Sequence, residues 1–152
     1  MRPFLPLITA TLLCGAALHF PSLAEPPKER AAASKDVTAS QVNGTWRCRK
    51  NTIKVWALGG GKLQVDVDCI FEYKSSAYGP MANLGQAAGT AKIEGDTAVF
   101  IPTDDEKDGK ITMRFAGGKM IVEQTGTCGF GHRVYATGTY EKVSAKKPKF
   151  GE

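Results

Sequence analysis

The most constraining feature of this sequence is the alternation of tight glycine turns with long, chemically varied connections after Gly44. The glycine turns lie at residues 59–61, 95–96 and 117–118. The long connections lie at residues 74–86, 103–109 and 126–131. In an up-and-down antiparallel sheet, consecutive strands run in opposite directions, so alternate connections fall at opposite ends. We therefore expect glycine turns to close one end of the domain and the long connections to gather at the other, where a functional site should lie.

The segments between these connections have the two-residue period of β-strands. Residues 63–71 show it most clearly, because every second side chain is apolar while Gln64, Asp66 and Asp68 share the other face. This pattern is typical of an antiparallel strand with one face on a core. The predicted strands cover residues 44–50, 52–58, 63–71, 88–94, 97–101, 110–115, 119–125 and 132–143. The inward side chains of the last strand are predicted to be Val134, Ala136, Gly138 and Tyr140.

Eight short antiparallel segments over residues 43–144 favour an all-β fold, a small closed up-and-down barrel. Closure removes the exposed edge strands that would otherwise pair with other chains. An interior of this size holds side chains or one small ligand. A β-sandwich is the alternative fold.

Residues 1–24 have the pattern of a signal peptide. Arg2 gives a positive start, an apolar run follows, and Ser22-Leu23-Ala24 matches a cleavage site. Lipidation at Cys14 is the alternative, although Leu13 is larger than the residue that normally precedes a lipidated cysteine. We therefore predict a protein that is periplasmic or secreted, with a flexible leader over residues 25–42.

Cleavage at this point would leave a basic chain. One of the 20 basic residues lies in the removed segment, which leaves 19 against 15 acidic residues and a net charge of +4. Part of this charge lies in a C-terminal tail, residues 145–152. Basic tails on exported proteins more often contact anionic surfaces than nucleic acid. We expect no nucleic-acid partner, and either peripheral contact of the tail with the anionic envelope or a role in solubility alone.

Three cysteines remain after the predicted cleavage, and the strand directions place all of them at the long-connection end. In an oxidising compartment two of them should pair. Cys48 and Cys69 are expected on next-nearest strands, about 10 Å apart, which is too far for a disulfide. We therefore predict a disulfide between Cys69 and Cys128, with Cys48 as the alternative partner of Cys128. The third cysteine would be buried or would pair between chains.

Residues 128–133 form the most distinctive stretch. Two glycines flank Phe130 between a cysteine and His132, and Arg133 follows. Rigid aromatic and arginine side chains are typical anchors of binding surfaces, so Phe130, His132 and Arg133 are candidate binding residues. The alternative is a glycine-rich turn whose phenylalanine plugs the end of the barrel.

The longest predicted connection, residues 74–86, contains apolar side chains where loops usually lack them. Tyr78 and Met81 are therefore candidate binding residues, as a lid over the mouth or as part of a contact patch. The alternative is that this connection packs back over the open end of the barrel.

The sequence favours no catalytic residue, no cofactor and no metal. A nucleophilic Cys128–His132 pair would need a reduced thiol, and no cofactor motif occurs. Residues 104–109 resemble the first half of a calcium loop, but Phe115 stands where the bidentate acid is required. We therefore expect a protein that is not an enzyme.

Parts of the chain also resemble known families. The run Cys128-Gly-Phe-Gly-His-Arg-Val-Tyr-Ala-Thr-Gly-Thr-Tyr resembles the closing segment of small exported proteobacterial hypothetical proteins, which implies an envelope location. Gly44-Thr45-Trp46 resembles the first-strand motif of calycin barrels such as lipocalins and avidins. The size, the export and the cysteines are similar to those of periplasmic lysozyme-inhibitor barrels, which present a loop to the active cleft of the enzyme.

Together these patterns predict a non-enzymatic binding protein of the cell envelope. It would take a small ligand or a loop of a partner protein at the long-connection end, through Tyr78, Met81, Phe130, His132 and Arg133. The alternative is inhibition of lysozyme or another envelope-degrading enzyme, although a basic chain would associate slowly with basic lysozymes.

Overall fold

The computed structural model describes residues 36–103 and 106–151, which all belong to one compact unit, Ala32–Glu152. The predicted signal peptide and the first part of the predicted leader, residues 25–35, lie outside the described residues. No helix in the described part of the chain is long and apolar enough to cross a membrane.

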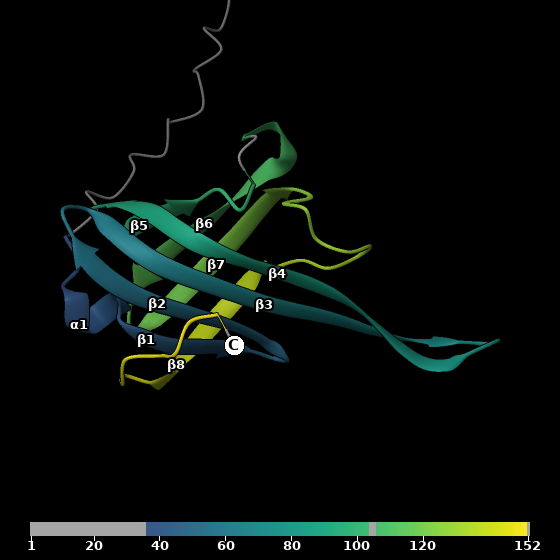
Figure 1. Cartoon of the computed structure of the whole chain (residues 1–152). Helices are drawn as coiled ribbons and strands as arrows, with labels where there is room; N and C mark the ends of the chain where they lie inside the picture. The colour runs from purple at the N-terminus through teal and green to yellow at the C-terminus, as the bar shows by residue number, and fades with distance from the viewer. Residues whose placement is uncertain (1–35, 104–105, 152) are drawn as a thin grey trace, which may run out of the picture. The chain divides into compact units, whose positions relative to one another are not determined.

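Eight antiparallel strands form a closed barrel, in which each strand pairs with its neighbours in the sequence and the last strand pairs with the first (Figure 1). The strands are β1 (Gly44–Cys48), β2 (Asn51–Gly59), β3 (Lys62–Ser75), β4 (Gly79–Glu94), β5 (Thr97–Phe100), β6 (Gly109–Ala116), β7 (Lys119–Gly126) and β8 (Gly138–Ser144). The described residues also contain two short helices, α1 (Ala39–Val42) and the 3-10 helix η1 (Glu106–Asp108). The predicted all-β up-and-down barrel is confirmed, and the alternative sandwich is wrong.

Apolar side chains from every strand fill the barrel interior. The inner face of β3 is the predicted one, because Leu63, Val65, Val67 and Cys69 are all buried. Trp46 on β1 is almost fully buried, and its ring lies tilted against that of Phe115, with 5.7 Å between centroids. Among the described residues, no buried side-chain polar atom lacks a hydrogen-bond partner. The barrel interior is therefore a packed core.

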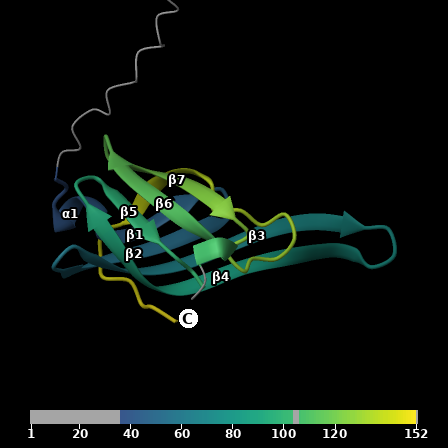
Figure 2. The ribbon, with the colours of Figure 1, turned by 90° about the horizontal axis from the view of Figure 1, so that it is seen from above.

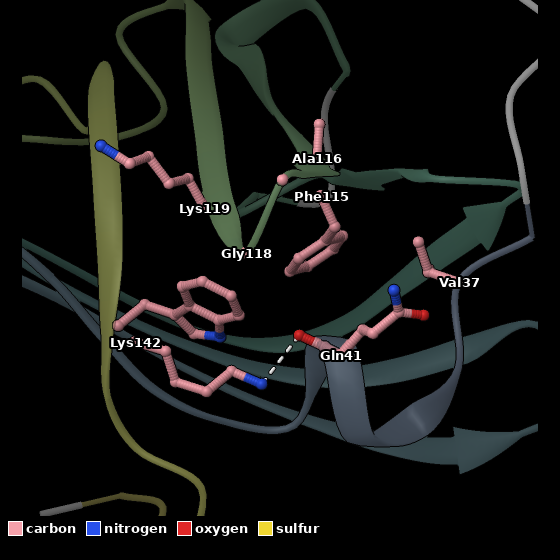
Figure 3. A pocket seen from close by; sticks show the side chains of 9 residues that line it. Val37, Gln41, Phe115, Ala116, Gly118, Lys119 and Lys142 are labelled. Carbon is pink, nitrogen blue, oxygen red and sulfur yellow. Dashed lines mark hydrogen bonds between the residues drawn. The ribbon is translucent and has the colours of Figure 1, made fainter.

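The segment before β1 closes the glycine-turn end of the barrel. Trp46 Nε1 donates a hydrogen bond of 2.9 Å to the Val42 carbonyl, and Val42 is buried. Lys142 Nζ on β8 donates to the carbonyls of Ser40 and Gln41, each at 2.8 Å, and lies 4.8 Å from the Trp46 ring centroid (Figure 3). The prediction of a flexible leader is therefore wrong for its last residues, 37–42, because their side chains and carbonyls are anchored to the barrel.

The two longest strands, β3 and β4, extend beyond the barrel as a two-stranded arm (Figures 1 and 2). We define the arm as residues 70–84. β2 pairs with β3 only as far as Asp68, whereas β3 and β4 stay paired as far as Ser75 and Gly79. The predicted connection over residues 74–86 is therefore wrong, because most of it forms the start of β4 and the turn itself comprises only residues 76–78.

The last predicted strand is shorter than expected, since β8 begins at Gly138 and not at residue 132. Residues 127–137, which we call the mouth loop, take the place of its first half. Gln124 Oε1 accepts a 2.7 Å hydrogen bond from the backbone amide of Ala136. The backbone amide of Gln124 donates to Thr137 Oγ1 at 3.1 Å. These side chains satisfy backbone groups that a β-ladder would otherwise pair. Val134, Ala136 and Tyr140 are nevertheless buried, as predicted.

The long connections lie at one end of the barrel, as predicted. The Cys128 amide of the mouth loop donates to the Asp108 carbonyl at 2.8 Å, which joins it to the connection between β5 and β6. The Gly131 amide donates to the Leu84 carbonyl at 3.0 Å, which joins the same loop to the base of the arm. The glycine turns lie at the opposite end because the strands alternate in direction.

Candidate functional site

Phe130 of the mouth loop packs into the end of the barrel against Gly85. A Cβ atom added at Gly85 would lie 2.5 Å from Phe130 Cγ and 2.8 Å from Val134 Cγ1, so only glycine permits this contact. Phe130 is half-buried and belongs to the side chains that pack on the core. The structure thus places Phe130 where the alternative interpretation expected it, as a plug of the barrel mouth.

Two asparagine side chains, one from the arm and one from β2, hold the rest of the mouth loop in place. Asn83 Nδ2 donates to the His132 carbonyl at 2.7 Å, and Asn51 Nδ2 donates to the Tyr135 carbonyl at 3.0 Å. The backbone at His132 is therefore fixed, whereas its side chain is exposed. Tyr135 is also exposed, at 60% of its surface. The loop is thus a well-anchored segment that presents polar and aromatic side chains to solvent.

Arg133 links the mouth loop to the arm. The Val134 amide donates to the Gly131 carbonyl at 3.1 Å, and within this turn Arg133 has a φ of 62°, at a position that favours glycine. Its guanidinium carbon lies 4.7 Å from the centroid of the Phe71 ring. Phe71 in turn stacks on Tyr73, with 6.2 Å between centroids and 19° between planes. A cation and two aromatic rings thus form one row from the mouth onto the arm.

This row continues to Met81, which lies opposite Tyr73 in the β3–β4 register. Paired residues on antiparallel strands project from the same face of the sheet. The structure therefore brings two of the predicted site residues, Met81 and Arg133, onto one surface through Phe71 and Tyr73. Tyr78 lies in the turn at the tip of the arm, away from this row, and Phe130 lies inside the mouth.

The exposed apolar side chains of the described residues are concentrated at the arm. Seven large hydrophobic side chains are exposed in this part of the chain, and four belong to the arm, namely Tyr73, Tyr78, Met81 and Leu84. Tyr78 is the most exposed of them, at 82%. These four side chains are exposed and lie outside the packed core of the barrel. The stability of the fold therefore does not explain why they are apolar.

A hollow of about 700 Å³ lies at the root of the arm, which we call the root hollow. The turn between β1 and β2 forms one wall, and the mouth loop with the start of β8 forms another. Its lining residues are Cys48, Arg49, Lys50, Asn51, Ile70, Phe71, Arg133, Tyr135, Thr137, Gly138 and Thr139. Sequence reasoning missed Arg49 and Tyr135, because it extended two strands through the turn at residues 49–50 and through the mouth loop.

The three described cysteines are free thiols, so the predicted Cys69–Cys128 disulfide is wrong. Cys69 faces the core and lies opposite Gly85 in the β-ladder. The side chain that covers Gly85 is that of Phe130 and not that of Cys128. Cys128 Sγ instead donates to the Thr125 carbonyl at 3.6 Å. The alternative pair with Cys48 is not formed either, and the half-buried Cys48 lines the root hollow.

Burial keeps the thiols of Cys69 and Cys128 protonated. Desolvation raises the pKa of Cys69 to about 12, against an opposing hydrogen bond with Tyr140. Desolvation also raises the pKa of Cys128, and the charge of Asp108 adds to the effect. A thiol with a raised pKa is a poor nucleophile at neutral pH, so neither side chain has the chemistry of a catalytic cysteine.

Within residues 36–103 and 106–151, no group of three or more His, Cys, Asp or Glu side chains is arranged to hold a metal ion. The partial calcium motif of the sequence falls on η1 and on Asp104 and Asp105, which lie outside the described residues.

Comparison of the chain with protein-family models, with curated proteins and with solved structures finds no match. The three sequence resemblances therefore stay predictions.

Proposed function

We propose that this protein is a non-enzymatic binding protein of the cell envelope, and that the arm together with the mouth loop is its contact surface for a partner protein. The observation that carries the proposal is the position of the exposed apolar side chains. Four of the seven large ones in the described residues project from a two-stranded extension that the barrel itself does not cover. A fifth, Tyr135, lies in the adjacent mouth loop.

The composition of this surface favours a protein partner. Tyrosine, phenylalanine, methionine and arginine are enriched in the buried centres of protein interfaces, and the row Arg133, Phe71, Tyr73 and Met81 contains one or more of each. The rings of this row already stack on one another, so binding would cost little side-chain entropy. A small ligand inside the barrel is less favoured, because core side chains from every strand fill the interior.

Site-specific photo-crosslinking tests the proposal. A photoreactive amino acid replaces Tyr78 or Tyr135 at the arm end. As matched controls, it replaces Leu58 or Val143, which lie on other parts of the barrel and are 55% and 53% exposed. In the host cell, positions 78 and 135 should give one discrete adduct, and positions 58 and 143 none. Equal adducts from all four positions would show non-specific contact and would contradict the proposal.

Inhibition of an envelope-degrading enzyme is the second candidate. The feature that favours it is the projecting tip of the arm, whose Tyr78 side chain is 82% exposed and suited to enter a cleft. Glycoside hydrolase clefts contain paired carboxylates, and the arm also carries the exposed Lys74. A lysozyme assay with the purified chain tests this candidate, and the absence of inhibition at about micromolar concentrations across several lysozyme types would exclude it.

A further inference from the structure

We infer that the root hollow is a separate binding site for a phosphate-bearing small molecule or headgroup, and that Arg49 and Arg133 bind the phosphate group. The inference does not depend on the partner proposed for the arm. It rests on the charge, the backbone geometry and the size of the hollow.

All the charged residues that line the root hollow are basic. Of the eleven lining residues, three are basic, Arg49, Lys50 and Arg133, and none is acidic. Lys50 forms an ion pair with Glu72. Within the described residues, neither arginine is in an ion pair. Two arginines therefore line one hollow whose lining contains no carboxylate to balance them, which favours an anionic ligand.

The backbone holds both arginines in a conformation that their residue type disfavours. Arg49 has a φ of 54° and Arg133 a φ of 62°, and only one other non-glycine residue in the described part, Cys128, has a positive φ. Arg49 follows Cys48 in a two-residue hairpin turn, a position usually taken by glycine or asparagine. Residues in such disfavoured backbone conformations cluster at ligand sites, where the role of the side chain in binding offsets the conformational strain.

The two arginines approach from different walls. Arg49 belongs to the turn between β1 and β2, and Arg133 belongs to the mouth loop, where the Phe71 ring supports its guanidinium at 4.7 Å. Each guanidinium presents a planar fork of N–H donors that matches two oxygens of a phosphate. The oxygens of a phosphate point in several directions, so a phosphate can accept both forks from opposite walls, and its higher charge matches two guanidinium groups better than a single carboxylate does.

The hollow is larger than a phosphate group. Its volume of about 700 Å³ is in the range of small-molecule sites. Tyr135, whose side chain is exposed, and the two threonines Thr137 and Thr139 also line the hollow. These groups offer a stacking surface and hydrogen bonds to an organic portion such as a sugar or glycerol unit.

Titration with inorganic pyrophosphate, followed by amide NMR shifts, tests the assignment. Saturable shifts are expected at Arg49, Asn51 and residues 133–139. Arg49→Gln and Arg133→Gln should each weaken the affinity about tenfold, the loss expected for one charged hydrogen-bonding group. Arg114→Gln is the matched control, because Arg114 is an exposed arginine on β6 outside the hollow. It should leave the affinity within about twofold of the original protein.

Vesicles of phosphatidylcholine with and without phosphatidylglycerol distinguish the source of the phosphate. Binding to the anionic vesicles that R49Q and R133Q abolish would identify a lipid headgroup, and binding of pyrophosphate alone would identify a soluble ligand. Either result supports the site. Absence of both, or equal weakening by R114Q, would overturn it. A Tyr73→Ser/Met81→Ser variant should bind pyrophosphate normally, so failure of the arm proposal and failure of this one are distinguishable.

Discussion

The guanidinium carbon of Arg133 lies 4.7 Å from the ring centroid of Phe71, and this contact joins the mouth loop to the arm. Arg133 lies 62 residues after Phe71 in the sequence, so the contact fixes two segments that the chain alone does not hold together. The same arginine lines the root hollow. One side chain therefore belongs to both surfaces to which we assign binding.

Replacing Phe71 by leucine should remove the cation–π contact while keeping an apolar side chain. We expect a loss of about 0.5–1 kcal/mol in the free energy of unfolding, the value of such a contact near the surface. Urea denaturation measures it. Tyr73→Leu is the control, because it removes the stacked ring and leaves Arg133 over Phe71. Tyr73→Leu removes only the stacking, so its loss should be smaller than that of Phe71→Leu. Phe71→Leu and Phe71→Leu/Arg133→Gln should lose equal stability; a further loss in the double variant would contradict the contact.

Replacing Gly85 by alanine should displace the mouth loop. The new methyl group would lie 2.5 Å from Phe130 Cγ, the root of the ring, so either Phe130 must change its χ1 rotamer or the backbone must shift. We expect a loss of about 1–3 kcal/mol, typical of overpacking, and a thermal melt checks it.

Gly89→Ala is the matched control for Gly85→Ala. Its Cβ would meet only the outer edge of the Phe100 ring, at 3.1 Å, so the loss should be smaller. In Gly85→Ala/Phe130→Ala the clash with the ring is absent and only the contact with Val134 Cγ1, at 2.8 Å, is left. The combined loss should therefore be less than the sum of the single losses. Additive losses would show that Phe130 does not pack on Gly85.

Replacing Arg49 by glycine should stabilise the protein by about 0.5–1 kcal/mol. The left-handed conformation costs an L-residue about 1–2 kcal/mol, which glycine avoids. Glycine loses more conformational entropy on folding, and this offsets part of the gain. Denaturant unfolding measures the change. Arg47→Gly is the control, since Arg47 lies within β1 and not in a turn, and it should destabilise. A destabilised Arg49→Gly variant would show that Arg49 supports the fold and was not retained for binding.

Alkaline pH should destabilise the fold. Burial raises the folded-state pKa of Cys69 from its ordinary value of 9.0 to about 12, and it raises the pKa values of Cys128 and Tyr140 above their ordinary range. Each group is neutral when protonated, so the folded state keeps protons that the unfolded state releases. This contribution to stability is complete below pH 9.0 and falls as the pH rises toward about 12.

Above its unfolded-state pKa, each buried thiol should lower the free energy of unfolding by about 1.4 kcal/mol per pH unit. Urea unfolding at a series of pH values from about 8 to 11 measures the slope. Cys69→Ala should be less stable at neutral pH and should show a shallower decline. A free energy of unfolding that stays constant across this range would contradict the burial of the thiols.

The barrel could be predicted from the sequence because its strands alternate clearly and its turns contain glycine. In β3 every second residue from Leu63 to Cys69 is buried, and this period alone identifies the strand and its inner face. The gathering of long connections at one end followed from strand direction. Such features are local in the sequence, so no knowledge of distant contacts was needed.

The arm could not be predicted in this way. Residues 79–87 contain glycine, proline, asparagine and alanine, which have low β-propensity. They form a strand because they pair with β3, a contact that no local pattern reveals. In residues 132–137 the reverse holds. The alternation is present and Val134 and Ala136 are buried, but side chains such as Gln124 replace the β-ladder.

The candidate site was only partly predictable for the same reason. Met81 and Arg133 could be selected as unusual residues, but the two rings that connect them, Phe71 and Tyr73, look like the end of an ordinary strand. The disulfide prediction failed because strand direction fixes which end a cysteine occupies, whereas Cys69 and Cys128 differ in the direction of their side chains.

The affinity of the crosslinked partner, once purified, for the Tyr73→Ser/Met81→Ser variant tests the central claim most directly. Both side chains are exposed, at 38% and 40%, so the melting temperature should stay within a few degrees of the original while the affinity falls about a hundredfold, as for the loss of two interface anchors. Leu58→Ser should change neither. Unchanged affinity in the double variant, or a loss of affinity matched by Leu58→Ser, would show that the arm is not the binding surface.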